Sequence, residues 1–111
     1  RTGGVFAPAS DRADRLCRAG EQVGEAWWRM PLLEDHVEDV KGELADLKQA
    51  PPGPGGVTAA LFLREFTGGL PWAHLDIAGP ARAEKNYAEV VAGGTGFAAR
   101  SLVALAAGLV D

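Results

Sequence analysis

Apolar residues recur at helical spacing in the first quarter of the chain. They lie three, four or a multiple of a helical turn apart, and they are Ala13, Leu16, Cys17, Val23 and Trp27. Ser10-Asp11 is typical of a helix N-cap followed by an acidic first turn, and Pro31 is typical of a helix end. The pattern predicts a helix over residues 11–28. Gly20 and Gly24 interrupt its apolar stripe and permit the close approach of a neighbouring element.

Residues 34–49 are mostly charged, but four apolar side chains keep helical spacing. These are Val37, Val40, Leu44 and Leu47. We expect a short surface helix here, with a turn at Gly42. The next residues, 50–56, read APPGPGG, a proline and glycine cluster that cannot belong to a helix or to a central strand.

Two further apolar stretches differ in length and composition. Residues 57–66, VTAALFLREF, predict a buried helix that Thr67-Gly68-Gly69 closes. Residues 72–77, WAHLDI, have the length and composition of an interior strand.

The last third of the chain contains one strongly helical segment. Residues 78–92 lack a periodic pattern and predict a loop, and Gly93-Gly94-Thr95-Gly96 predicts a tight turn. Residues 97–109 are rich in alanine and predict a helix. The order helix, strand, helix without an internal repeat indicates part of an α/β layer.

Composition restricts the class of protein. The chain has 111 residues, enough for one domain, and its apolar fraction of 47% is that of a folded globular protein. The net charge is −4, the pI is near 5.1, and the eleven Lys and Arg are scattered. This balance argues against nucleic acid as a partner.

The single cysteine and the apolar runs bear on location. Cys17 alone cannot form an internal disulfide, which fits a reducing compartment, so we expect a cytoplasmic protein. The longest apolar run, residues 102–110, is about half of a membrane span, and the first residues lack the form of a signal peptide. Because the chain opens on Arg1 and its only methionine is Met30, we expect that processing or fragment selection removed what came before.

His74 and Asp76 are the first candidates for chemistry. Side chains two apart in a strand share a face, so this pair could bind a metal ion or position a proton. A zinc centre needs three or four protein ligands. The other candidate ligands lie on the predicted surface helix and are Glu34, Asp35, His36, Glu38 and Asp39. We favour the alternative that both residues are buried and hydrogen-bond loop backbone, because an unpartnered polar group would cost about 1–3 kcal/mol.

Three other features have structural readings that we prefer to functional ones. The glycine-rich turns at residues 53–57 and 93–97 could hold an anion, but neither has the spacing of a phosphate loop. Cys17 could act as a nucleophile, but its place on the apolar stripe favours a buried thiol. In a helix, Trp27 and Trp28 would point about 100° apart, so one is expected to face the core and the other a neighbour or solvent. These residues alone form no complete catalytic constellation.

Five segments together resemble a known family in both order and spacing. They are residues 25–32, EAWWRMPL, residues 45–48, ADLK, residues 56–63, GVTAALFL, residues 72–79, WAHLDIAG, and residues 94–97, GTGF, before the last predicted helix. This set is similar to the C-terminal part of leucyl aminopeptidases, the M17 metallopeptidase family, and the resemblance runs from about residue 5 to residue 107.

The resemblance implies an α/β fold, namely a C-terminal fragment of a mixed-sheet aminopeptidase catalytic domain with helices packed around one or two strands. It implies a cytoplasmic exopeptidase, hexameric when complete, that removes N-terminal residues from peptides with two divalent metal ions, zinc or manganese. The Asn-Thr-Asp-Ala-Glu-Gly-Arg motif that supplies metal ligands in the family is absent from this sequence. The family's order places that motif and the catalytic Lys and Arg before Arg1, so we expect no metal ligand and no catalytic residue in this chain.

The resemblance also suggests a role for two small residues. Residues after the WAHLDIAG segment line the family's pocket for the first side chain of the substrate, and the matching positions are Ala78 and Ala81. Alanine at both would leave room for leucine or another bulky apolar residue. His74 and Asp76 do not match the family's metal or catalytic residues, and residues 83–91 do not align with its pattern.

Two hypotheses follow for the chain as a whole. In the first, residues 1–111 are the C-terminal part of a single peptidase catalytic domain, inactive alone, with apolar faces of the TAALFL helix and WAHLDI strand left uncovered. In the second, the chain is a non-enzymatic interaction or assembly module derived from the same fold. An aspartate-rich metal motif in the coding sequence before Arg1 would favour the first hypothesis.

Overall fold

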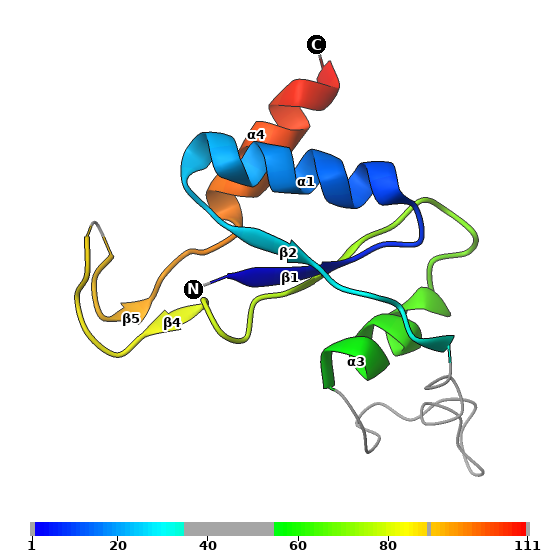
Figure 1. Cartoon of the computed structure of the whole chain (residues 1–111), viewed down its shortest axis with the longest axis horizontal. Helices are drawn as coiled ribbons and strands as arrows, with labels where there is room; N and C mark the ends of the chain where they lie inside the picture. The colour runs from blue at the N-terminus through cyan, green and yellow to red at the C-terminus, as the bar shows by residue number, and fades with distance from the viewer. Residues whose placement is uncertain (1, 35–54, 89, 111) are drawn as a thin grey trace.

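A three-stranded mixed sheet forms the framework of the molecule (Figure 1). The computed structural model describes residues 2–34, 55–88 and 90–110. Strand β1, Gly3–Phe6, is central; β2, Trp27–Arg29, pairs with it in parallel, and β3, His74–Asp76, pairs with it antiparallel. The mixed sheet and the helices around it confirm the α/β class. Strand β1 was not among the predicted elements.

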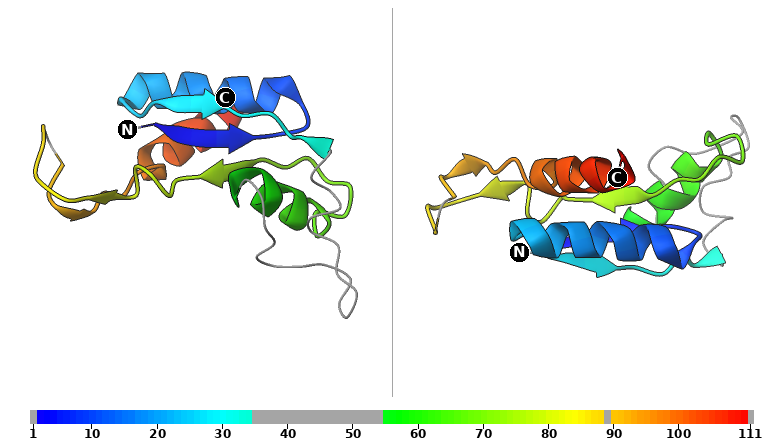
Figure 2. Two further views of the ribbon diagram at one scale, coloured as in Figure 1. Left: turned by 60° about the horizontal axis from the view of Figure 1, so that its bottom comes forward. Right: turned by 90° about the horizontal axis from the view of Figure 1, so that it is seen from above.

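Helices lie on both faces of this sheet (Figure 2). Helices α1, Ser10–Val23, and α4, Ala99–Val110, pack against each other on one face. Helix α3, Gly55–Arg64, packs on the other, against β1 and β3. Successive side chains of β1 point to opposite faces of the sheet, so this strand can pack against helices on both faces.

Each face of β1 has a hydrophobic core of its own. Val5 packs with Ala13 and Leu16 of α1, with Leu75 and Leu105 at the margin. Phe6 packs on the opposite face with three buried residues of α3, which are Val57, Ala60 and Leu61. Two adjacent residues of one short strand therefore anchor two layers of helix.

Helix α1 ends at Val23, so the predicted end at residue 28 was wrong. Gly24 adopts a left-handed conformation with φ of 77°, and its N–H caps the helix on the Gly20 carbonyl. The chain then turns back, and Trp27 pairs with Gly3 in the sheet. The predicted N-cap was also displaced, because Ala9 is the N-cap and the Ser10 hydroxyl accepts a hydrogen bond of 2.6 Å from Arg29.

Helix α3 confirms the predicted buried helix, but it begins at Gly55, inside the segment that was expected to exclude helix. Gly56 permits close packing, since a Cβ there would lie 2.8 Å from Asp76 Oδ2 and 3.2 Å from the Phe6 ring. Strand β3 is shorter than predicted and lies at an edge of the described sheet, with its three residues half-buried. The expectation of an interior strand is therefore not met by the described residues.

The segment predicted as loop and turn contains a β-hairpin. Strands β4, Arg82–Ala83, and β5, Gly93–Gly94, pair antiparallel and extend away from the body of the molecule (Figure 1). Tyr87 and Val90 form a further bridge near its tip. The short strands carry no alternating apolar pattern, so periodicity did not reveal them.

Two predictions fall on residues that the structure does not describe, namely most of the surface helix over residues 34–49 and the first residues of the proline and glycine cluster. Among the helices of the described ranges, none has the length and apolar character needed to cross a membrane. The predicted contrast between the two tryptophans is confirmed, since Trp27 is half-buried and Trp28 is 69% exposed. Their strand, rather than a helix, sends them to opposite faces.

Candidate functional site

A small pocket lies on the face of the sheet that carries α3. Trp28, Gly4 and Asp76 are directly paired across the three strands, so they point to the same face. Gly4 has no side chain and leaves an open floor between the other two. The pocket has a volume of about 250 Å³, and its lining residues are Thr2, Gly3, Gly4, Trp28, Met30, Asp76, Ala78 and Gly79.

The rim of this pocket is the tight turn that follows β3. Asp76 Oδ1 accepts a hydrogen bond of 3.1 Å from the Ala78 N–H, and the Ala81 N–H donates to the Ile77 carbonyl at 2.9 Å. Both bonds fix the turn's own shape. Two residues, Ala78 and Ala81, are predicted for a substrate pocket. Ala78 lines the small pocket over Gly4, whereas Ala81 is half-buried at the end of the turn and is not among the lining residues; their contact with substrate stays a prediction.

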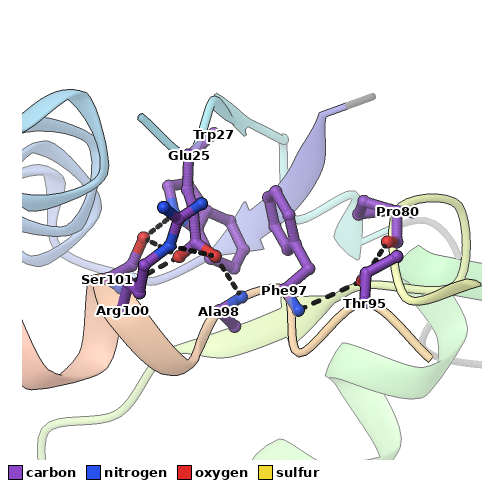
Figure 3. Close-up of polar contacts among 8 residues, drawn as sticks. All are labelled: Glu25, Trp27, Pro80, Thr95, Phe97, Ala98, Arg100 and Ser101. Carbon is purple, nitrogen blue, oxygen red and sulfur yellow. Dashed lines mark hydrogen bonds and ion pairs between the residues drawn. The ribbon is translucent and has the colours of Figure 1, made fainter. Parts of the chain in front are cut away.

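Thr95 joins this turn to the segment that precedes α4 (Figure 3). Its hydroxyl donates to the Pro80 carbonyl at 2.6 Å and accepts a hydrogen bond of 3.2 Å from the Phe97 N–H. Its own N–H donates to the Ala81 carbonyl at 2.9 Å. The sequence suggested only a tight turn at residues 93–96, so this contact was not foreseen.

A buried carboxylate fixes the start of α4. Glu25 is 3% exposed and accepts hydrogen bonds from Ala98 N–H at 3.1 Å, Ser101 N–H at 2.9 Å and Ser101 Oγ at 2.7 Å (Figure 3). Trp27 Nε1 donates to the same Ser101 Oγ at 2.8 Å. A carboxylate on free N–H groups at a helix start is stabilised by hydrogen bonds and by the helix dipole. This capping residue is remote in sequence, so no local signal could have identified it.

The packing of two aromatic rings connects the start of α4 to β1, which forms the pocket floor. The Trp27 and Phe97 rings lie 5.0 Å apart and tilted at 53°. Both pack where a side chain on Gly3 would be, since a Cβ there would lie 2.7 Å from each ring. Glycine at this position of β1 is therefore required by packing on one face, as Gly4 leaves the floor open on the other.

His74 and Asp76 share one face of β3, as predicted, but they are not arranged as a metal site. The His74 ring packs on Phe6 with centroids 5.8 Å apart. Burial lowers the pKa of His74 below its usual value, and the neighbouring Asp76 carboxylate partly opposes this effect. Asp76 hydrogen-bonds loop backbone at Ala78 N–H, which agrees with the structural alternative, although both residues are half-buried rather than fully buried.

Metal donors do not gather in the part of the chain that the structure describes. Within residues 2–34, 55–88 and 90–110, no three His, Cys, Asp or Glu side chains are placed to hold one ion. Glu34, one of the candidate ligands, pairs instead with Arg64 at 2.5 Å, and this hydrogen bond lowers its carboxyl pKa. The other candidates on the predicted surface helix lie outside the described residues. A metal centre of the family's kind does not fit the described residues alone.

Cys17 has the surroundings of a packed thiol, but it is half-buried rather than buried as predicted. It contacts the Trp27 carbonyl at 3.9 Å and packs beside the core of Val5, Ala13 and Leu16. Burial first, then Asp14 and Glu21, raise the pKa of the thiol. A raised pKa lowers the thiolate fraction at neutral pH, which is the opposite of what a nucleophilic cysteine needs.

Sequence comparison places the chain beside aminopeptidases. Residues 1–103 match the model of the cytosol aminopeptidase family, catalytic domain. A probable cytosol aminopeptidase of Acaryochloris marina is 48% identical over 101 residues, which cover 90% of this chain and 20% of that protein. A probable cytosol aminopeptidase of Synechocystis is 43% identical over 110 residues, covering 98% of this chain and 22% of that protein.

Solved structures give the same similarity. The bottromycin maturation enzyme BotP in complex with Mn superposes with a TM-score of 0.92 at 40% identity, and the match covers 100% of this chain and 25% of that one. A mutant of tomato leucine aminopeptidase superposes with a TM-score of 0.83 at 36% identity, covering 94% of this chain and 20% of that one. The chain thus spans a quarter or less of each of these relatives.

Proposed function

Since this chain belongs to the cytosol aminopeptidase family, we propose that it forms the C-terminal part of the catalytic domain of an aminopeptidase that removes leucine and other apolar residues from the N-termini of peptides. In this proposal the chain supplies helices, the three-stranded sheet and part of the pocket for the substrate's first side chain. It supplies neither the metal ligands nor the catalytic Lys and Arg, and it is inactive alone.

The pocket over Gly4 is the observation that carries this proposal. Its apolar walls are Trp28, Met30 and Ala78, and its floor is bare because Gly4 lacks a side chain. A volume of about 250 Å³ is enough for one apolar side chain, and no reacting group is needed for that role. Ala78 is assigned to this pocket, and Ala81 to the end of the turn that shapes its rim.

The complete enzyme of this proposal uses two divalent metal ions, zinc or manganese, to polarise the scissile carbonyl and supply hydroxide. The manganese complex of BotP supports the use of a divalent metal in this family. In this proposal, residues outside this chain would hold both ions. We also propose a cytoplasmic enzyme, in keeping with the names of the relatives as cytosol aminopeptidases. That the complete enzyme is a hexamer is a proposal from the family resemblance alone.

Ala78→Phe in the aminopeptidase that contains this chain tests the pocket assignment. The benzyl group would fill the space beside Gly4, so kcat/KM for a leucyl-aminomethylcoumarin substrate should fall about 10- to 100-fold more than for the alanyl substrate. Ala106→Phe on the exposed side of α4 is the matched control and should change neither value.

The results separate the alternatives. An unchanged leucyl to alanyl ratio in an active Ala78→Phe enzyme would refute the pocket assignment. The peptidase proposal would fail if the wild-type protein that contains this chain hydrolysed neither substrate with zinc or manganese present. The non-enzymatic assembly module would then be favoured.

A further inference from the structure

The turn that forms the pocket's rim, residues 77–81, is held by two kinds of contact. Bonds from Asp76 to Ala78 and from Ala81 to Ile77 lie within one short segment. Asp76 pairs with Gly4, so the near end of the turn is held beside β1, which forms the floor, but neither bond ties the far end of the turn, at Pro80 and Ala81, to another element. Within residues 2–34, 55–88 and 90–110, two hydrogen bonds reach the turn from a distant part of the chain, and both come from Thr95.

The Thr95 hydroxyl acts as both donor and acceptor in these contacts. It donates to the Pro80 carbonyl at 2.6 Å and accepts from Phe97 N–H at 3.2 Å, so one side chain joins the turn to the segment before α4 (Figure 3). Pro80 is buried and Thr95 half-buried, which limits competition from water for the bond. A hydroxyl is the smallest group that can donate and accept at the same time.

The segment on the other side of Thr95 is fixed to the sheet. The Phe97 ring packs with Trp27 against Gly3, and Glu25 caps α4 at Ala98 and Ser101. Gly3 and Gly4 are also lining residues of the pocket. Thr95 therefore links the floor of the pocket to the far end of its rim, since its hydroxyl reaches Pro80 from outside the turn.

We propose that Thr95 is a positioning residue for specificity: its hydroxyl holds the turn 77–81 at the distance from β1 that determines which side chains the pocket accepts. This inference rests on the proposed function, since it assigns the pocket to the substrate's first side chain. Thr95 does not touch the substrate, and it acts through Pro80 and the backbone of Ala78 and Gly79.

Thr95→Val and Thr95→Ser in the aminopeptidase that contains this chain test the proposal. Valine has nearly the shape of threonine but makes neither hydroxyl bond, whereas serine retains both. In the valine variant we expect the ratio of kcat/KM for leucyl over alanyl substrates to change about 10-fold. The serine variant should retain the wild-type ratio.

Thr67→Val is the matched control. The Thr67 hydroxyl is half-buried and donates to the Arg64 carbonyl at 2.8 Å, so its loss removes a comparable bond at the end of α3, away from the pocket. This variant should lower stability like Thr95→Val but leave the substrate ratio unchanged. Equal losses for both substrates in Thr95→Val would overturn the proposal, because they would indicate a purely structural role.

Amide hydrogen exchange gives a readout that does not depend on activity. Peptides covering residues 77–84 should exchange several-fold faster in Thr95→Val than in wild type or Thr95→Ser, while peptides of α1 stay unchanged. If the wild type shows no peptidase activity but this exchange pattern holds, the proposed function fails and the link itself stands. Unchanged exchange in Thr95→Val would overturn the link.

Discussion

Glu25 shows how one residue can organise segments that are far apart in the sequence. It follows α1 directly, yet its carboxylate accepts three hydrogen bonds from the start of α4. Arg100 adds an ion pair at 3.8 Å from the solvent side. A buried acceptor with this many donors is expected to be sensitive to truncation, because the donors cannot turn to water.

Glu25→Ala should therefore destabilise the protein by roughly 1–3 kcal/mol, since it leaves buried N–H groups and the Ser101 hydroxyl without their acceptor. The local measurement is amide exchange at residues 98–102, which should accelerate. Glu21→Ala, an exposed glutamate of α1, should leave both stability and exchange nearly unchanged. Equal behaviour of the two variants would contradict the role of Glu25 as a cap.

The pKa of His74 can be measured by histidine hydrogen–deuterium exchange with mass spectrometry. Burial keeps the ring neutral, so the midpoint should lie below the usual value of about 6.5. Asp76 opposes this shift, so Asp76→Asn should lower the midpoint further. A midpoint at or above about 6.5 in the wild type would contradict the burial of this ring.

The same shift predicts how stability depends on pH. In the unfolded chain His74 takes up a proton near pH 6.5, whereas the folded state resists protonation. The contribution of the neutral His74 ring to the free energy of unfolding is therefore fully present above that pH. It is lost as pH falls through the lower folded pKa. His74→Gln should flatten this part of the stability profile, and His36→Gln is the comparison for the other histidine of the chain.

Single residues could be predicted from the sequence where their neighbours in the chain determine their role. The packed thiol of Cys17 follows from a local apolar stripe, and the Asp76 bond to Ala78 N–H from a turn two residues away. Trp28, Glu25 and Thr95 were missed as parts of the site. Their roles depend on partners such as Gly4, Ser101 and Pro80, which only the folded chain brings near.

Glycines decide where several elements begin and end. Gly24 stops α1 about a turn before the predicted end, and Gly20 provides the surface on which the returning strand packs. A Cβ on Gly20 would overlap the Glu25 carbonyl and the Trp27 ring. The helical spacing of apolar residues extended to Trp27 by coincidence. Trp27 lies in a short strand, and the alternation of side chains along that strand also directs it toward the core.

Gly20→Ala and Gly108→Ala form a matched pair that tests this role. Both glycines are helical, but a Cβ on Gly108 in α4 meets nothing within 4 Å. Alanine at Gly108 should stabilise the protein by about 0.5–1 kcal/mol through helix propensity. Alanine at Gly20 should destabilise it by roughly 1–3 kcal/mol, because β2 must move. Thermal unfolding measures both, and the same sign for the two variants would refute the argument.

At the scale of the molecule, the α/β class could be predicted, but the sheet could not. Three strands of three or four residues are too short for periodicity to identify, and β1 begins with two glycines. The pocket depends on the register that aligns Trp28, Gly4 and Asp76. Register arises from pairing across the chain, so the sequence led to Ala78 only through family resemblance.

Several large apolar side chains remain exposed in this chain. Phe66 after α3 is 68% exposed, Leu70 is 70% exposed and Val103 on α4 is 71% exposed. Apolar surface on this scale favours contact with other protein surface. Within the TAALFL segment itself, the exposed large apolar side chain is Leu63, at 46%.

The 111-residue chain alone should therefore self-associate at micromolar concentrations. Sedimentation velocity should show a weight-average mass that rises with concentration, and Phe66→Ser with Val103→Ser should reduce the rise. Glu21→Ser with Arg18→Ser, on the exposed side of α1, provides the control. A concentration-independent monomer with cooperative unfolding would contradict this prediction.

The positions of the paired strands in the sequence also predict the order in which parts of the pocket fold. Strand β1, helix α1 and strand β2 form a compact unit near the start of the chain, whereas β1 pairs with β3 between residues far apart in the sequence, such as Gly4 and Asp76. Contacts between distant residues close late, because the intervening chain must first lose its freedom. On the ribosome, the floor of the pocket is thus expected to assemble before its rim has been synthesised.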